Sequence, residues 1–221
     1  MKKIITIVIV IVIIIIMFFI KFNYKSLKFG NNMSSKSADE IKEYILGINS
    51  YEAKSTIRIE SNKNVNEYVI KEQYKKEDNI YKQEVIQPEN IAGICYMYDG
   101  YNLKIENNKL NLTKIYENYQ YIGENTITLI GFINDYKVAE ESNVSQTDNE
   151  IILEIKVKSA NKYIANKKLY IDRNTGNPSK LEIKDITQKA KIYISYNEIK
   201  INNLQKEDIL AFKMKTITND I

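Results

Sequence analysis

The chain has 221 residues, of which 44% are hydrophobic and none is histidine, and its formal net charge is +4. Five lysines flank an apolar amino-terminal run, and without these five charges the net charge falls from +4 to −1, so the basic surface of a nucleic-acid-binding protein is not expected. The absence of histidine excludes Ser-His-Asp and Cys-His nucleophile activation and the common zinc sites. The single cysteine, Cys95, excludes an intrachain disulfide.

Residues 4–20 form an uncharged run, and a helix over these 17 residues would be roughly 25 Å long, close to the thickness of the hydrocarbon core of a membrane. A signal peptide usually has a shorter apolar region of about 7–15 residues, followed by small residues at the cleavage site. Here bulky and basic residues follow the run, and no lipobox cysteine is present. We therefore expect an uncleaved signal anchor, whose apolar residues include Ile4, Ile11, Phe18, Phe19 and Ile20.

This run divides the chain into three parts. We expect residues 1–28 to be the membrane anchor, residues 29–36 a polar linker, and residues 37–221 the domain. Lysines lie on both sides of the run, so the positive-inside rule is nearly balanced, but a tail of three residues favours its staying in the cytoplasm. The domain would then lie on the extracytoplasmic side, in the cell envelope. A cleaved leader is the alternative, and it would place the mature amino terminus near Ser34 or Ser35.

A helix is predicted over residues 37–51, SADEIKEYILGINSY. Ser37 can cap its amino terminus, and Glu40 three residues later completes a capping box. Apolar residues follow at spacings of three and four, which is typical of a helix with one buried face. They are Ile41, Tyr44, Ile45, Ile48 and Tyr51.

After this helix, apolar residues recur at every second position, which indicates half-buried strands. In KSTIRIES, Ile57 and Ile59 alternate with charged residues. Asp99-Gly100 predicts a tight hairpin between two later runs. The spacings predict an antiparallel meander, with further strands in residues 65–75, 79–87, 92–98, 101–106 and 109–115.

An amphipathic stretch over residues 125–139, NTITLIGFINDYKVA, interrupts the meander and predicts a second helix. Apolar alternation then resumes, and one more strand is expected in the tail NEIKINN. About ten or eleven antiparallel strands cannot stay in one flat sheet. We therefore predict an α+β, mainly β domain: a curved antiparallel sheet, or unclosed half-barrel, with two helices on its concave side.

The order of these elements resembles a known family. QPENIAGICYMYDGYNLKI and, after the second helix, KKLYIDRNTGNPSKLEIKD with AKIYISYNEIKIN resemble the lipoprotein-carrier fold of the LolA and LolB type, over residues 37–212. The opening IKEYILGINSYEAKSTIRIESNKN is similar to that of the clostridial germination lipoproteins related to GerS. That resemblance implies a non-catalytic spore-envelope protein that supports a cortex N-acetylmuramoyl-L-alanine amidase in cortex modification and germination. Lipoprotein members carry a lipobox cysteine, which this chain lacks.

Two groups of residues are candidate binding positions. Tyr116, Tyr119 and Tyr121 form a candidate partner surface, because tyrosine is enriched at interface hot spots, and the alternative is ordinary aromatic packing in strands. Unpaired edge strands offer a second route to a partner, or to a second copy in a homodimer. The residues expected to line an apolar concave cavity are Ile57, Ile59, Leu153 and Ile155. No catalytic, cofactor-binding or metal-binding residue is predicted.

The sequence favours a non-enzymatic, membrane-tethered envelope protein that binds a protein partner. The alternative is a lipid or lipoprotein carrier that uses the apolar concavity, against which a permanent anchor argues. An enzyme is disfavoured because no catalytic constellation is present. An envelope-stress sensor is disfavoured because only three residues precede the apolar run.

Overall fold

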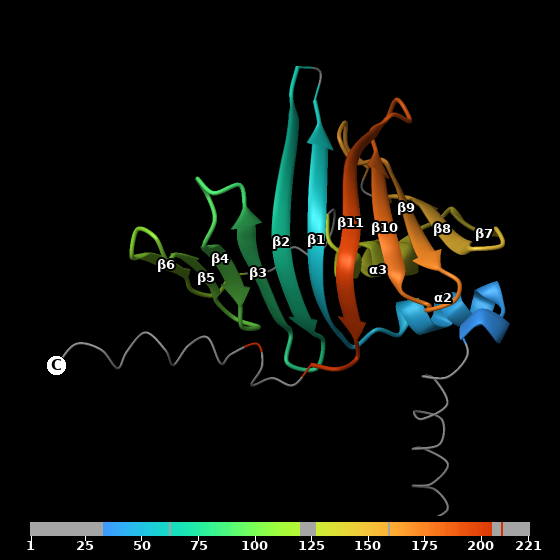
Figure 1. Cartoon of the computed structure of the whole chain (residues 1–221), viewed down its shortest axis with the longest axis horizontal. Helices are drawn as coiled ribbons and strands as arrows, with labels where there is room; N and C mark the ends of the chain where they lie inside the picture. Colours follow the sequence, from blue (N-terminus) through green and yellow to red (C-terminus); the bar gives the residue numbers. More distant parts are fainter. Residues whose placement is uncertain (1–32, 62, 120–126, 159, 205–208, 210–221) are drawn as a thin grey trace, which may run out of the picture.

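The computed structural model describes residues 33–61, 63–119, 127–158, 160–204 and 209. Its main feature is an 11-stranded antiparallel sheet with the strand order β6-β5-β4-β3-β2-β1-β11-β10-β9-β8-β7 (Figure 1). β1 lies at the centre of the sheet, and β6 and β7 are its edge strands. The strands are β1 (Ser50–Glu60), β2 (Val65–Lys75), β3 (Ile80–Gln87), β4 (Ile94–Tyr98), β5 (Leu103–Asn107), β6 (Leu112–Tyr116), β7 (Ser142–Gln146), β8 (Glu150–Lys156), β9 (Asn166–Asp172), β10 (Pro178–Lys184) and β11 (Ala190–Ile201).

Two helices, α2 (Ala38–Leu46) and α3 (Leu129–Val138), pack on the concave side of this curved sheet (Figure 1). The capping box predicted for α2 is confirmed: the Glu40 amide donates to Ser37 Oγ at 3.2 Å, and the Ser37 amide donates to Glu40 Oε2 at 2.9 Å. At α3, the Gly131 amide donates to Thr128 Oγ1 at 3.1 Å, so this helix begins four residues later than the sequence predicted. The predicted mainly β domain with an unclosed sheet is confirmed.

Two strands differ from the prediction, each for a physical reason. β7 was not predicted, because this edge strand is polar and almost entirely exposed, so it has no apolar alternation. The tail strand predicted after residue 196 is instead the end of β11, one strand of 12 residues. Opposite Lys54 and Ser55, a bulge adds one extra residue to β11, so the next inward-facing residue after Tyr196 is Ile199. In the sequence, this break in the alternation resembles the boundary between two strands.

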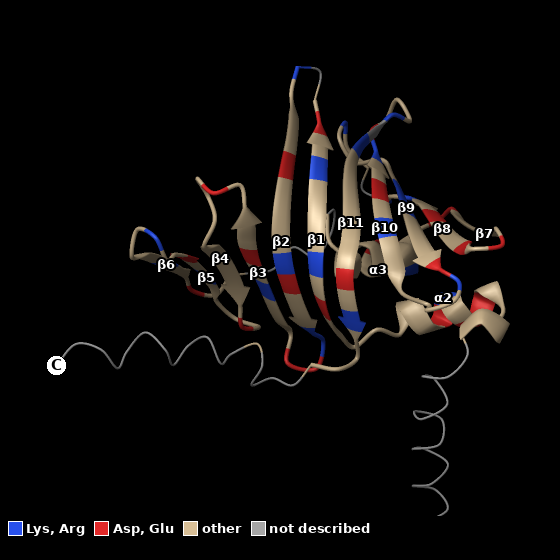
Figure 2. Ribbon diagram, viewed as in Figure 1, with Lys and Arg blue, Asp and Glu red and all other residues tan. Residues whose placement is uncertain are grey.

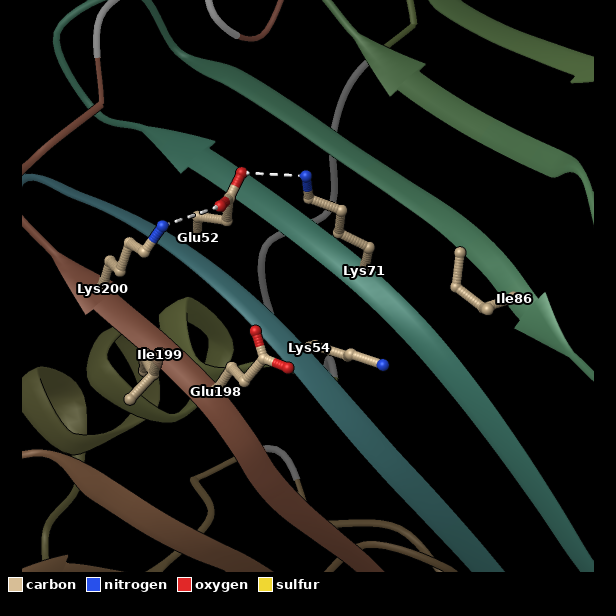
Figure 3. A pocket seen from close by; sticks show the side chains of 7 residues that line it. All are labelled: Glu52, Lys54, Lys71, Ile86, Glu198, Ile199 and Lys200. Atoms are coloured by element: carbon tan, nitrogen blue, oxygen red, sulfur yellow. Dashed lines mark ion pairs between the residues drawn. The ribbon is translucent and has the colours of Figure 1, made fainter.

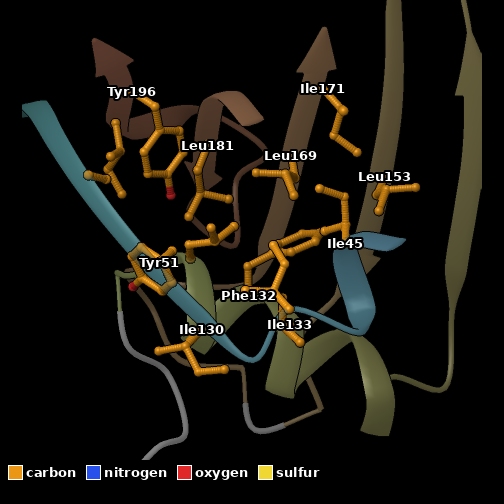
Figure 4. Close-up of a cluster of buried hydrophobic side chains, with 14 of the residues drawn as sticks. Ile45, Tyr51, Ile130, Phe132, Ile133, Leu153, Leu169, Ile171, Leu181 and Tyr196 are labelled. Carbon is orange, nitrogen blue, oxygen red and sulfur yellow. The ribbon is translucent and has the colours of Figure 1, made fainter. Parts of the chain in front are cut away.

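The hydrophobic core lies between the two helices and the inner face of β1 and β8–β11 (Figure 4). Alternate residues of each strand contribute to it, as the period of two predicts. The fully buried members with the largest side chains include Tyr51, Phe132, Ile45, Ile133 and Leu153. The helices are therefore held mainly by burial of their apolar faces, which is the dominant favourable term in folding.

A buried ion pair also attaches α3 to the sheet. Lys167 Nζ of β9 lies 2.6 Å from Asp135 Oδ2 of α3, and the two side chains are only 0% and 5% exposed. Burial lowers the pKa of Lys167, and the neighbouring Asp135 carboxylate opposes that change. Each charge needs the other, because an unpaired charge at this depth would be strongly destabilising.

The segment before α2 contacts the turn between β9 and β10, which lies far from it along the chain. Met33–Ser35 forms a short 3-10 turn, η2, inside the predicted linker, and the buried Met33 side chain packs against Gly176 in the β9–β10 turn. Gly176 has φ +70, and a Cβ there would collide with Met33. The predicted anchor, including Ile4, Ile11, Phe18, Phe19 and Ile20, lies outside the described residues. Among the helices that are described, none is long and apolar enough to cross a membrane. The boundaries at residues 28 and 36 stay predictions.

The Asp135–Lys167 pair gives a first prediction. Asp135→Asn leaves the Lys167 ammonium buried without its counter-charge, so we expect a loss of about 3–5 kcal/mol in the free energy of unfolding. The double variant Asp135→Leu with Lys167→Met should recover most of the lost free energy of unfolding, because it leaves no buried charge. Urea denaturation of the full chain measures both effects.

The matched control is the exposed pair of Lys156 and Glu141, whose side chains are 61% and 70% exposed. Glu141→Gln should change the free energy of unfolding by less than about 1 kcal/mol. The structural role given to the buried pair is wrong if Asp135→Asn costs no more than this control.

Candidate partner-binding face

Among the described helices, α2 and α3 pack on one half of the inner face of the sheet, and neither packs on the other half. The core cluster under α2 and α3 draws on β1, β8–β11 and Ile70 of β2, and no described residue of β3–β6 belongs to it. In Figure 1, β3–β6 lie at the end of the sheet away from α2. The inner face of β3–β6 is therefore the candidate binding surface.

Four tyrosines stand side by side across this inner face. Tyr51 of β1 is the cross-strand partner of Tyr74, Tyr74 of Tyr81, and Tyr81 of Tyr98 in β4. The ring centroids of Tyr51 and Tyr74 are 5.9 Å apart, within the range of attractive aromatic pairs. Such cross-strand pairs stabilise neighbouring strands, so the row joins β1, which lies under the helices, to β2, β3 and β4.

Toward the edge strand β6 the inner face becomes exposed, and apolar side chains there alternate with polar ones such as Lys114, which is the partner of Ile105. Tyr96 lies opposite Ile105 of β5, and Leu112 and Tyr116 are on the same face of β6. The exposed fraction is 36% for Tyr96, 41% for Tyr116 and 61% for Leu112. We define the tyrosine face as the exposed inner-face side chains Tyr96 and Tyr116, together with the buried Tyr81 and Tyr98 that adjoin them.

A buried carboxylate lies in this part of the sheet, next to the helix-covered half. Glu72 of β2 has no exposed surface, and its Oε2 accepts hydrogen bonds from the hydroxyls of Tyr51 at 3.1 Å and Tyr81 at 3.4 Å. Burial raises the pKa of Glu72 to about 7, although both hydrogen bonds act to lower it. Glu72 is therefore divided between its neutral and charged forms near neutral pH.

One sequence signal could have revealed Glu72. Tyr68, Ile70 and Tyr74 occupy the inner phase of β2, and Glu72 stands between them where the alternation calls for an apolar residue. An acidic residue in the apolar phase of a strand marks a buried carboxylate. The tyrosine row gives no such signal, because cross-strand neighbours are set by register, which depends on the whole sheet.

The residues predicted as a partner surface are only partly placed. Tyr116 is exposed and belongs to the tyrosine face. Tyr119 packs edge-on against Tyr98 with 6.4 Å between ring centroids, and its amide donates to the Tyr101 carbonyl at 2.9 Å. Tyr121 lies outside the described residues. A role of Tyr116 and Tyr119 in partner binding stays a prediction.

The residues predicted to line a cavity lie in the core. Ile57, Leu153 and Ile155 are buried members of the core cluster, and Ile59 is partly buried against it. Side chains of α2 and α3 belong to the same cluster, so they occupy the space in front of these strands. Ligand binding at these four positions would require the helices to move, and it stays a prediction.

The convex face of the sheet is highly charged, with bands of both signs on β2, β1 and β11 (Figure 2). A cavity of about 330 Å³ lies there, lined by Glu52, Lys54, Lys71, Ile86, Glu198, Ile199 and Lys200 (Figure 3). Lys71 and Lys200 pair with Glu52 at 3.1 and 3.9 Å. Partial burial alone would raise the pKa of Glu52, but hydrogen bonds from Lys71 and Gln73 outweigh it and keep this pKa below its ordinary value. This carboxylate is an ion-pair partner and not a proton donor at neutral pH.

Two further observations concern thiol reactivity and metal binding. The Cys95 thiol is buried, and burial raises its pKa to about 11, so the reactive thiolate is scarce near neutral pH. Within the described ranges, no group of three or more Asp, Glu or Cys side chains is arranged to hold a metal ion. The geometry of the inner face suits binding through aromatic and apolar contacts.

Known proteins share both the sequence pattern and the fold of this chain. A family model described as "Sporulation protein YdcC-like" matches residues 2–210, and no curated protein matches the chain.

Similar solved structures include a chain from the complex of the CwlD amidase with the GerS lipoprotein of Clostridioides difficile. The identity is 28%, the match covers 72% of this chain and 91% of that chain, and the TM-score is 0.47. An uncharacterized conserved protein from Thermus thermophilus matches at 13% identity, with 79% and 93% covered and a TM-score of 0.48. The LolA superfamily protein NE2245 from Nitrosomonas europaea matches at 12% identity, with 79% and 98% covered and a TM-score of 0.40.

These comparisons confirm the family that the sequence motifs indicated, since the family model spans almost the whole chain. TM-scores below 0.5 are too low to transfer a partner or a ligand from the solved structures.

Glu72 gives a prediction about pH. Its pKa of about 7 in the folded protein lies above the ordinary value of 4.5, so the folded state holds this proton more tightly than the unfolded state. The resulting stabilisation is fully present below pH 4.5 and is lost as the pH rises through 7. Its full size is about 3 kcal/mol, since each tenfold difference in proton affinity is worth about 1.4 kcal/mol.

Glu72→Gln should remove this dependence, because glutamine has no proton to release. Urea denaturation of the full chain and of Glu72→Gln between pH 4.5 and 8 isolates the Glu72 contribution as the difference between the two curves. That difference should change steadily with pH. A constant difference would contradict the raised pKa.

Proposed function

The chain belongs to the YdcC-like family of sporulation proteins, and from this premise we propose that it is a non-enzymatic protein that binds a protein partner through the tyrosine face. The observation that supports this most directly is an inner sheet face with exposed Tyr96, Leu112 and Tyr116 and no described helix over it. The other half of the same face is covered by α2 and α3.

Physical chemistry supports a protein as the ligand of this face. Tyrosine combines a large apolar ring with a polar hydroxyl, and it is enriched at the energetic centres of protein interfaces. The face is also backed by a buried aromatic row, so its exposed side chains are held on a rigid sheet. A preorganised face of this kind loses less conformational entropy on binding.

We propose a cell-wall N-acetylmuramoyl-L-alanine amidase as the partner, in spore cortex modification and germination. The support is the likeness of residues 41–64 to germination lipoproteins related to GerS. The lack of histidine and the burial of Glu72 and Cys95 support a role without catalysis by this chain itself.

We also propose that the domain works on the extracytoplasmic side of a membrane, tethered by residues 1–28. The support is the uncharged run over residues 4–20 and the absence of a lipobox cysteine. A tether would replace the lipid anchor of lipoprotein relatives and would keep the tyrosine face close to the envelope where its partner acts.

The partner proposal predicts a specific loss of affinity. Full-length protein and a purified sporulation amidase from the same organism should form a complex. Tyr96→Ala with Tyr116→Ala should weaken it at least about thirtyfold, because even one hot-spot tyrosine contributes about 2 kcal/mol or more. Isothermal titration calorimetry measures the affinity.

Glu198→Ala, on the convex face, is the matched control and should leave the affinity unchanged. Failure of the unmodified chain to bind any such amidase would contradict the partner assignment. Co-purified lipid in place of a protein would favour the carrier alternative.

The tether predicts where the intact chain is found. In fractionated sporulating cells the full-length protein should remain with membranes after a high-salt wash, and amino-terminal sequencing should find no processing within residues 1–28. A mature amino terminus near Ser34 or Ser35 would show that the leader is cleaved.

A further inference from the structure

Three buried oxygen atoms at the centre of the sheet have no hydrogen-bond partner among the described residues: Ser55 Oγ, Glu72 Oε1 and the Tyr196 hydroxyl. The exposed fractions of these residues are 0%, 0% and 8%. Buried polar groups in folded proteins are nearly always paired, with protein or with ordered water, because an unpaired one loses its hydration without compensation. Three such atoms together therefore need a common explanation.

The strand register places the three side chains in one patch of the inner face. Ser55 of β1 is the direct cross-strand partner of Tyr196 in β11. Ala53, two residues before Ser55, is the partner of Glu72 in β2, so Ser55 and Glu72 are diagonal neighbours on adjacent strands. Burial first, and then the charge of Glu72, raise the pKa of Tyr196, as expected for a hydroxyl close to that carboxylate.

We propose that Ser55, Glu72 and Tyr196 together bind one buried water molecule. The water would donate one hydrogen bond to Glu72 Oε1 and a second to one of the two hydroxyls, and it would accept one from the other hydroxyl. Three hydrogen bonds are about the average for a water buried in a protein. One molecule therefore satisfies all three oxygens.

The chemistry of the patch disfavours other ligands. One carboxylate and two neutral hydroxyls are too few oxygen ligands for a calcium or magnesium ion, which takes about six or more. A larger molecule does not fit the burial, because neither Ser55 nor Glu72 has any exposed surface. Water also suits both forms of Glu72, since it donates to the carboxylate and accepts from the protonated acid.

The bound water completes the hydrogen bonding of the Glu72 carboxyl group. The hydroxyls of Tyr51 and Tyr81 already donate to Oε2, and the water serves Oε1. Because its three partners come from β11, β1 and β2, it also links the helix-covered half of the sheet to the half that bears the tyrosine face.

A high-resolution crystal structure of the full chain in detergent tests the site directly. We expect one solvent peak at about 2.6–3.2 Å from all three oxygens. The proposal is overturned if the side chains pair directly with one another and leave no solvent, or if the density there is that of an ion with more ligands.

A double-mutant cycle gives a second, independent test in solution. Ser55→Ala and Tyr196→Phe should each lower the thermal unfolding midpoint, and the double variant should lose clearly less than the two losses added together, because both hydroxyls act through the same water. Tyr74→Phe, in the same sheet face but outside the three-atom group, should combine additively with Ser55→Ala. Additive losses for Ser55→Ala with Tyr196→Phe would overturn the shared site.

Discussion

The packing of α2 and α3 over only half of a curved sheet is the constraint on which the rest of the structure depends. Apolar burial supplies most of the attraction, and the Asp135–Lys167 ion pair fixes where α3 sits against β9. A buried ion pair of this kind adds little net stability over an apolar pair, but the loss of either partner is strongly destabilising. The helices are thereby kept over β1 and β8–β11, and neither of them packs on the inner face of β3–β6.

Glu72 lies where these two halves meet. On one side are the core and its helices, and on the other are tyrosines that become more exposed toward β6. A carboxyl group without a cationic partner is an expensive residue for such a position, and its hydroxyl donors, Tyr51 and Tyr81, belong to the aromatic row. The tyrosine row therefore has two roles. It donates hydrogen bonds to the Glu72 carboxyl group, and it supports the exposed rings nearer to β6.

Much of the fold follows from local sequence signals. The Ser37–Glu40 capping box, the Asp99-Gly100 hairpin and the apolar alternation predicted α2, the β4–β5 hairpin and most strands, because each depends on residues close together in the chain. β7 was missed because a polar edge strand is defined by its neighbour β8 and has no apolar pattern of its own. Of the candidate site, the sequence pointed only to Tyr116, since the row from Tyr51 to Tyr98 and the place of Glu72 beside it arise from strand register, which no single segment determines.

The central claim is that the inner face of β3–β6, on which neither α2 nor α3 packs, is the binding surface of this YdcC-like protein. Hydrogen–deuterium exchange of the full chain, alone and with a purified sporulation amidase, tests it most directly because it locates contact along the backbone. The account predicts that protection on binding is concentrated in β4, β5 and β6. Protection confined to the convex face around Glu52 and Glu198, or to α2, would contradict it.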